Sequence, residues 1–146
     1  MNVALAEAAP AFARDVLRDG LAALQEARLT VTGSCMAPAV CPGDVVTLVA
    51  TSRRPPRLGD VVLADAAEGL RLHRLVWISA RGCRTKADRA PTWDPVLSGT
   101  EVLATVTELR RGSVVKDPRS AGWALRSLVA VAFAYARAGA AALRGR

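Results

Sequence analysis

A thiol and an imidazole can together cleave a peptide bond, and this sequence holds three cysteines and a single histidine, His73. Cys35 follows Gly33 in a bend, and Pro38 stops that bend from continuing as a helix. The bend lies between two runs rich in β-branched residues, so a side chain on it can face a cleft. We therefore consider Cys35 a candidate nucleophile, with its own backbone N–H as oxyanion donor, and His73 the candidate base.

Three other roles for these residues can be weighed from the sequence. Ser34 is a rival nucleophile, but in alternating strand geometry its side chain points away from the face that Cys35 uses, so we favour Cys35. A disulfide between Cys35 and Cys41 would silence the thiol in an oxidising compartment. The spacing of the cysteines is not that of a tight metal knuckle, so we expect no metal and no cofactor.

Residues 33–44 read Gly-Ser-Cys-Met-Ala-Pro-Ala-Val-Cys-Pro-Gly-Asp. This segment resembles the active-site segment of the signal peptidase I family and its relatives, the self-cleaving repressors. Their pattern is Gly-x-Ser-Met-x-Pro, followed by Gly-Asp before a strand. Gly33, Met36 and Pro38 match it, and Cys35 stands where the family has its nucleophilic serine. The resemblance implies that Gly33, Met36 and Pro38 lie at the substrate-binding site.

Two further segments extend the resemblance. Residues 59–62, Gly-Asp-Val-Val, look like the second Gly-Asp-strand element of the family. Residues 72–75, Leu-His-Arg-Leu, look like the segment that carries the general base, in the form where histidine is followed by arginine. The resemblance therefore implies that His73 is the general base.

The aspartates come from a third segment. Residues 85–88, Thr-Lys-Ala-Asp, together with Asp94 are similar to the family's Lys-Gly-Asp…Asp stretch, with alanine in place of the glycine. From the residues alone, either Asp88 or Asp94 could orient the imidazole. The resemblance implies that Asp94 is the orienting aspartate and that Asp88 is the accompanying, structural one. Lys86 belongs to this motif, and we expect it to pair with a carboxylate rather than act as a base.

Length and composition limit the architecture and the partners. A chain of 146 residues suits one domain with terminal appendages, and a hydrophobic fraction of 51% with 4% aromatic means that Ala, Val and Leu fill the core. A net charge of +7 favours anionic partners such as phospholipid headgroups, although a merely basic solvated surface is equally compatible. No aromatic stacking set, zinc knuckle or helix-turn-helix pattern is present, so we expect no specific nucleic-acid partner.

The hydrophobic pattern predicts a mainly β fold between two helices. Residues 10–28 have apolar side chains at helical spacing, typical of a helix that packs on its own sheet or docks on a partner. Short β runs separated by turn signals then continue to residue 115. We expect an N-terminal amphipathic helix in residues 1–28, a signal-peptidase-like β domain in 29–116 and a C-terminal basic amphipathic helix in 117–146. The fold class implied is a coiled, partly barrel-like antiparallel sheet with flanking N- and C-terminal helices.

The C-terminal segment predicts a helix over residues 121–143 with an unusual charge pattern. At about 100° per residue, Arg119, Arg126, Arg137 and Arg144 fall within about 20° of one line on an otherwise apolar cylinder. This geometry favours a helix lying in the headgroup layer of an anionic membrane. A core or dimer helix is the plain alternative, and a tilted span with snorkelling arginines is a less favoured one. The longest uncharged central run is below the roughly twenty residues of a membrane span. The first ten residues are not typical of a secretory signal, so we expect a location in the cytoplasm or at the inner membrane face.

Together these features predict an endopeptidase that cleaves a peptide or protein precursor, with Cys35 attacking, His73 as base and Asp94 orienting it. The resemblance implies an extended substrate added to a strand edge beside Cys35, with small side chains before the cut. Two alternatives remain: a catalytically inactive peptide-binding module that keeps the groove, and a membrane-surface scaffold that depends on the C-terminal helix.

Overall fold

The computed structural model describes residues 2–5 and 11–144. In this part of the chain, eight strands form one sheet in the order β1-β2-β3-β7-β4-β5-β6, with β8 paired to β7. All neighbours are antiparallel except β1, which is parallel to β2. The strands are β1 (Asn2–Leu5), β2 (Glu26–Val31), β3 (Val45–Ala50), β4 (Val61–Ala66), β5 (Gly69–Ser79), β6 (Gly82–Lys86), β7 (Val102–Arg111) and β8 (Val114–Lys116).

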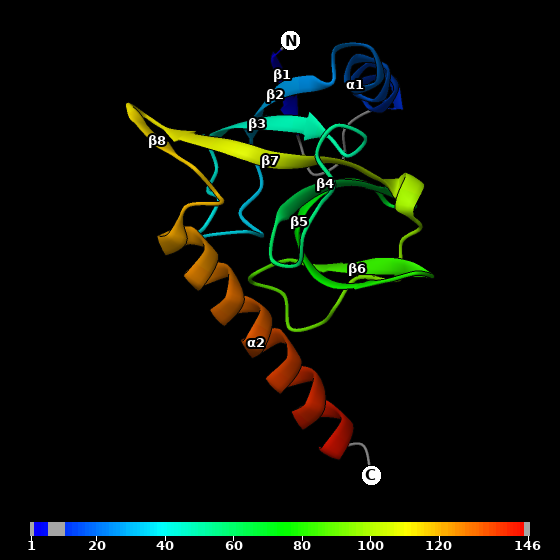
Figure 1. Ribbon diagram of the computed structural model, residues 1–146, viewed down its shortest axis with the longest axis vertical. Helices are drawn as coiled ribbons and strands as arrows, with labels where there is room; N and C mark the ends of the chain where they lie inside the picture. The colour runs from blue at the N-terminus through cyan, green and yellow to red at the C-terminus, as the bar shows by residue number, and fades with distance from the viewer. Residues whose placement is uncertain (1, 6–10, 145–146) are drawn as a thin grey trace.

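The helix α1 (Ala11–Leu24) lies between β1 and β2 in the chain, and the helix α2 (Ala121–Arg144) follows β8. One 3₁₀ turn, η1 (Gly99–Glu101), precedes β7. The mainly antiparallel sheet with N- and C-terminal helices confirms the predicted fold class at that level (Figure 1). The sheet curls through β4 and β5 in Figure 1, but its strand order ends at β1 and β6, so it is not closed.

The first helix is shorter than the sequence predicted. It ends at Leu24, because Gln25 adopts the left-handed conformation with φ 59°, and its side-chain amide donates to the carbonyl of Ala22 at 2.9 Å. The chain then continues directly as β2, in which Ala27 and Leu29 are buried on one face. The prediction of helix up to residue 28 was therefore wrong for its last residues.

The α1 helix packs on its own sheet. Leu17 and Leu21 are buried in the main core cluster, and both Arg14 and Arg18 pair with the nearly buried Asp65 of β4. Of the two interpretations of this amphipathic segment, packing on the sheet is the one that the structure shows.

The α2 helix rests on the sheet by one face and projects beyond it (Figure 1). Trp123, Ser127, Val131 and Ala134 form its buried face. The predicted stripe of four arginines is wrong in one member: Arg119 precedes the helix, and its guanidinium donates to Asp60 at 2.7 Å.

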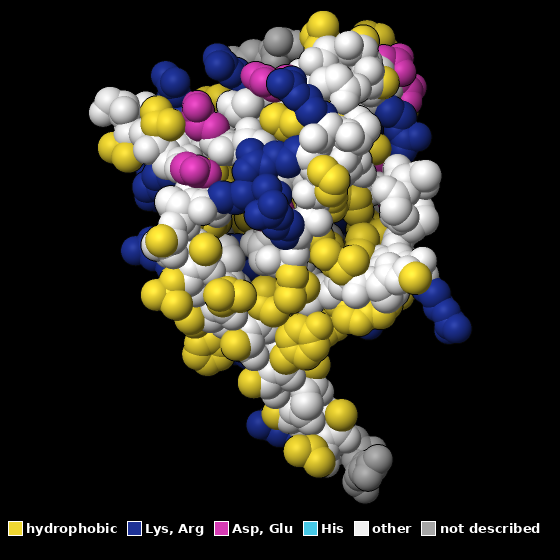
Figure 2. All heavy atoms as spheres, in the orientation of Figure 1, with side chains coloured by type: hydrophobic (Ala, Val, Ile, Leu, Met, Phe, Trp, Pro, Cys, Tyr) yellow, Lys and Arg dark blue, Asp and Glu magenta, His cyan; other side chains and the backbone are white. Residues whose placement is uncertain are grey.

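The remaining surface of α2 is strongly apolar, and Figure 2 shows apolar side chains gathered along this helix. With 24 residues, or about 36 Å at 1.5 Å per residue, α2 is long and apolar enough to cross a membrane by length and composition. The short uncharged run at the centre of this segment therefore does not by itself exclude a span. The exposed large apolar side chains of α2 are Leu125, Leu128, Val129, Phe133, Tyr135 and Leu143.

Candidate active site

The candidate nucleophile lies in a closed loop between β2 and β3. Where the loop closes, Val31 donates its N–H to the carbonyl of Asp44 at 2.8 Å, and Gly43 donates to the carbonyl of Val31 at 2.7 Å. Gly43 has φ 89°, a conformation that other residues rarely adopt, so this turn requires glycine. The Gly-Asp pair of the motif therefore fixes the exit of the loop that carries Cys35.

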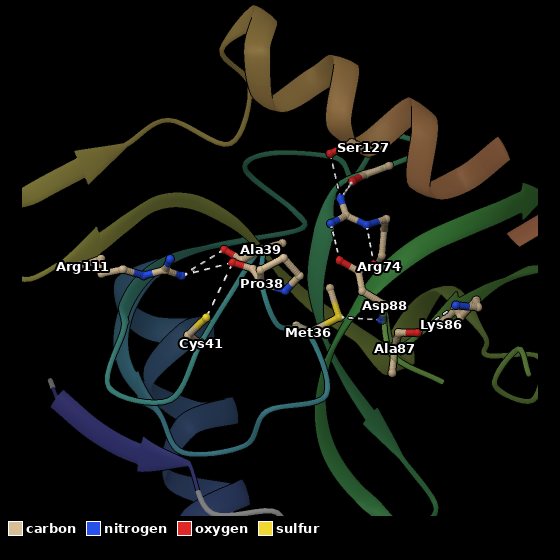
Figure 3. A network of polar contacts seen from close by, with 11 residues as sticks. Met36, Pro38, Ala39, Cys41, Arg74, Lys86, Ala87, Asp88, Arg111 and Ser127 are labelled. Atoms are coloured by element: carbon tan, nitrogen blue, oxygen red, sulfur yellow. Dashed lines mark hydrogen bonds and ion pairs between the residues drawn. The ribbon is translucent and has the colours of Figure 1, made fainter. Parts of the chain in front are cut away.

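The carboxylate of Asp44 and the guanidinium of Arg111 hold this loop in place. Asp44 accepts the N–H of Cys41 at 2.7 Å and two hydrogen bonds from Arg111 at 2.8 and 2.7 Å. Arg111 also reaches the carbonyl of Pro38 at 3.4 Å (Figure 3). Burial pushes the pKa of Asp44 upward, but the hydrogen bonds from Arg111 and Cys41 outweigh it and lower that pKa. The loop is thus held by charge-assisted bonds.

The segment after β6 also holds the loop at the candidate nucleophile. Arg89 donates its backbone N–H to the carbonyl of Cys35 at 3.0 Å, and Asp88 donates its backbone N–H to the sulfur of Met36 at 3.4 Å. Met36 is 2% exposed and belongs to the main core. The adjacent residues Cys35 and Met36 therefore point differently: Met36 enters the core, and Cys35 is half-buried at the surface of the cleft.

The imidazole of His73 meets a carboxylate. His73, in β5, places Nδ1 2.6 Å from Oδ2 of Asp94, and the hydroxyl of Thr85, in β6, donates to the same oxygen at 2.6 Å. The backbone N–H of Asp94 donates to the carbonyl of Thr85 at 2.8 Å, which ties the Asp94 loop to β6. Arg71 lies 3.6 Å from the other carboxylate oxygen. The structure therefore brings His73 and Asp94 together, as the sequence predicted.

The electrostatics of this pair favour the charged forms. Burial lowers the pKa of His73, but hydrogen bonds and charge interactions with Asp94 and Cys35 outweigh burial and raise it from 6.5 to about 9. Burial likewise pushes the pKa of Asp94 upward, and its hydrogen bonds with His73 and Thr85 bring it below its ordinary value. These shifts favour an imidazolium beside a carboxylate at neutral pH. The Cys35 side chain lines the same cavity as the imidazole.

Cys35 and His73 line one cavity of about 250 Å³ between β2 and β5. The other lining residues are Leu29, Val31, Thr32, Gly33, Met36, Leu70, Arg71 and Leu72. Gly33 and Met36 lie where the resemblance implied, whereas Pro38 is exposed and outside this lining. Ser34, the rival nucleophile, is exposed and also outside it. The cavity is mostly apolar, and its polar side chains include the thiol of Cys35, the imidazole of His73 and Arg71.

Asp88 lies apart from the imidazole. Its carboxylate accepts two hydrogen bonds from the buried Arg74, at 2.8 and 2.6 Å. Arg74 also donates to the carbonyl of Gly59 at 2.9 Å and to the hydroxyl of Ser127, in α2, at 2.7 Å (Figure 3). The geometry therefore does not support Asp88 as a member of the catalytic group and gives it a structural role. Lys86 does not pair with a carboxylate as expected: its ammonium donates to the carbonyl of Ala87 at 3.0 Å.

Several supporting residues escaped the sequence reasoning. Thr85 and Arg111 hold the two aspartates, Asp94 and Asp44, but nothing in their local sequence marks them as partners of distant carboxylates. Arg74 follows His73 in the segment 72–75, Leu-His-Arg-Leu, and this position could have indicated a structural partner for Asp88.

All three cysteines are free thiols. Within the residues that the structure describes, no group of three or more His, Cys, Asp or Glu side chains is arranged to hold a metal ion.

No protein-family model and no curated protein matches this chain.

Proposed function

We propose that this protein is a cysteine endopeptidase of the signal peptidase type, which cleaves a peptide or protein precursor. Cys35 is the nucleophile, His73 the acid and base, and Asp94 the residue that orients the imidazole. The observation that carries the proposal is the shared cavity of Cys35 and His73, with Nδ1 of His73 bound to Asp94 at 2.6 Å. A partly barrel-like curvature of the sheet, as in signal peptidases, belongs to the same proposal.

The proposed reaction begins from an ion pair. Because Nδ1 of His73 is bound to Asp94, the other ring nitrogen, Nε2, serves Cys35. In this proposal Cys35 attacks as its thiolate, the nucleophilic form of the side chain, and the neighbouring imidazolium stabilises the negative sulfur. Sγ bonds to the scissile carbonyl carbon while the C=O π electrons move onto oxygen, where the backbone N–H of Cys35 supports the negative charge.

The remaining steps return the site to its starting state. Collapse of the oxyanion breaks the C–N bond, and the imidazolium of His73 gives its proton to the leaving amine, which leaves a thioester on Cys35. Water then attacks the thioester as neutral His73 takes one of its protons. Collapse of the second oxyanion releases the carboxylic acid and restores the thiolate–imidazolium pair.

A site-directed thiol reagent tests the proposal, because the chain contains its own control. Cys35 and Cys41 lie in one loop and are both half-buried, but of the two only Cys35 lines the cavity that contains the imidazole. We expect a peptidyl chloromethyl ketone at pH 7 to label Cys35 at least tenfold faster than Cys41, and His73→Ala to remove this preference. Labelling sites are identified by mass spectrometry of the digested protein.

Cleavage itself is measured with a library of extended peptides, with products identified by mass spectrometry. We expect Cys35→Ala to abolish cleavage, while Cys41→Ser and Ser34→Ala retain it. Uniform slow labelling of all three cysteines, without cleavage, would contradict the enzyme and favour the inactive peptide-binding module.

We also propose that α2 places the enzyme on an anionic membrane surface at the cytoplasmic side. Supporting this are the exposed apolar side chains of α2, such as Phe133 and Leu128, together with the exposed Arg126 and Arg137 on the same helix. Flotation with vesicles containing phosphatidylglycerol should recover the full chain, and recovery should fall for Leu128→Glu with Phe133→Glu. Equal recovery of both proteins would contradict this placement, and a purely membrane-bound scaffold would show flotation without Cys35 reactivity.

A further inference from the structure

The described chain begins with a strand that lies beside the candidate cleft. β1 pairs in parallel with β2, so that Val3 is level with Leu29 and Leu5 with Val31. Leu29 and Val31 both line the cavity that contains Cys35. The other edge of β2 is paired with β3, so β1 takes the one edge of β2 that the main sheet leaves open.

The direction of β1 is also the direction that the proposed function requires of a substrate. β2 runs from Glu26 to Val31 and reaches Cys35 four residues later. A strand parallel to β2 therefore advances towards the nucleophile. A peptide that presents a carbonyl to Cys35 after an extended stretch would run along this same edge in this same direction.

The opposite wall of the cavity is formed by a strand with an unpaired half. β5 pairs with β4 from Gly69 to Arg74, whereas its pairing with β6 begins only at Arg74. Within the described residues, the edge of β5 from Gly69 to His73 that faces away from β4 therefore has no strand partner, and Leu70, Leu72 and His73 line the cavity. Unpaired strand edges are the sites where an extended peptide adds backbone hydrogen bonds.

We infer that the segment Asn2–Leu5 occupies the backbone edge on which the peptide substrate docks, so that a substrate must displace β1 before Cys35 can attack. The inference rests on the proposed function and adds regulation to it: the chain carries an internal competitor for its own substrate edge. β1 pairs over only four residues, so its displacement is a local opening that does not require the domain to unfold. The apparent affinity for a substrate is lowered by the fraction of molecules in which β1 is docked.

Proline substitution in β1 tests the competition in the full chain. Val3→Pro with Ala4→Pro removes two backbone N–H groups and disfavours pairing, while Val3→Thr with Ala4→Ser keeps them as the matched control. The measurement is the rate of Cys35 modification by a tripeptidyl chloromethyl ketone and by iodoacetamide. We expect the proline variant to react about five- to tenfold faster with the peptidyl reagent and less than about twofold faster with iodoacetamide. An unchanged peptidyl rate in the proline variant would overturn the inference.

Hydrogen exchange separates this inference from the proposed function. In the proline variant, amides of residues 26–31 that face β1 should lose protection, and a saturating non-cleavable extended peptide should restore it. These amides should stay protected in the threonine–serine control. If Cys35 reacts with neither reagent in any variant, the proposed function fails, but exchange still decides the inference. Unaltered protection of β2 after the proline substitutions, or no recovery with the peptide, would overturn it.

Discussion

His73 and Arg74 are consecutive residues of β5, and each binds an aspartate from the segment after β6, but the two pairs differ in every other respect. His73 faces the cavity and meets Asp94, which is also held by Thr85. Arg74 faces the interior behind the strand, where it binds Asp88 in two places. Strand alternation thus separates a pair that can do chemistry from a pair that holds the fold.

The two pairs also differ in their neighbours. Arg74 links three parts of the chain, since it binds the hydroxyl of Ser127 in α2 and the carbonyl of Gly59 as well as Asp88. Asp88 in turn donates its backbone N–H to Met36, next to the candidate nucleophile. The buried pair therefore positions the loops around the cleft, while His73, bound to Asp94, lines the cavity. The comparison teaches that neighbouring charged residues of one motif can have different roles.

The largest expected effect comes from breaking the buried pair. Asp88→Ala leaves the guanidinium of Arg74, which is 3% exposed, without its carboxylate. We expect the free energy of unfolding to fall by about 3–5 kcal/mol, because a buried charge then lacks compensation. Urea unfolding at pH 7 measures this. Asp94→Asn, which keeps an acceptor for His73 and Thr85, is the comparison variant and should lose clearly less.

The pH dependence of stability should identify the His73–Asp94 pair. The pKa of folded His73 is raised to about 9, so its contribution is fully present below pH 6.5 and is lost as pH rises through about 9. We expect the difference in unfolding free energy between wild type and His73→Ala to shrink by about 2–3 kcal/mol between pH 6 and pH 10. Urea unfolding of both proteins over this range provides the measurement. A difference that stays constant from pH 6 to pH 10 would show that the neighbours of His73 do not raise its pKa.

The Asp94 substitution should lower the reactivity of Cys35 more than the Asp88 substitution does, which is the reverse of their effects on stability. Asp94→Asn weakens the support for the imidazolium, so we expect the labelling rate of Cys35 at pH 7 to fall about tenfold or more. An Asp88 variant that is still folded, checked by circular dichroism at low temperature, should label Cys35 at a rate closer to wild type. If the Asp88 change lowered labelling more than the Asp94 change, the assignment of the two roles would be reversed.

The smallest expected effect concerns the link to α2. Ser127→Ala removes one of the acceptors of Arg74 and leaves the carbonyl of Gly59 and the Asp88 carboxylate in place. We expect a loss of about 1 kcal/mol in unfolding free energy. Ser113→Ala, at an exposed position in the turn between β7 and β8, is the control for a serine removed without a contact to Arg74. No difference between these two variants would show that the hydroxyl of Ser127 contributes nothing to the buried pair.

Much of this arrangement could be predicted from local sequence. The bend around Cys35 and the strands after residue 45 follow from proline, glycine and β-branched residues, which act through local backbone preferences. The meeting of His73 with Asp94 was predicted from a motif resemblance, and the structure shows the contact. Their catalytic roles remain a prediction.

Other features depend on tertiary structure and were not predictable in this way. The run Asn2–Leu5 is short and has no turn signal of its own, and only its parallel alignment with β2 makes it a strand. Helical periodicity could suggest that Ser127 is buried, but its partner Arg74 lies in a distant strand. The end of α1 at Leu24 depends on the left-handed conformation of Gln25, a residue with little preference for it.

The most direct test of the central claim is the rate of Cys35 labelling relative to Cys41, measured in one sample at pH 7 for wild type and for His73→Ala. Both thiols are half-buried in the same loop, so differences in access or reagent cancel to first order. If His73 and Asp94 activate Cys35, wild type should show a ratio of at least about ten, and the variant a ratio near one. A ratio near one in wild type, or one that His73→Ala leaves unchanged, would contradict the assignment of Cys35, His73 and Asp94 as an active site.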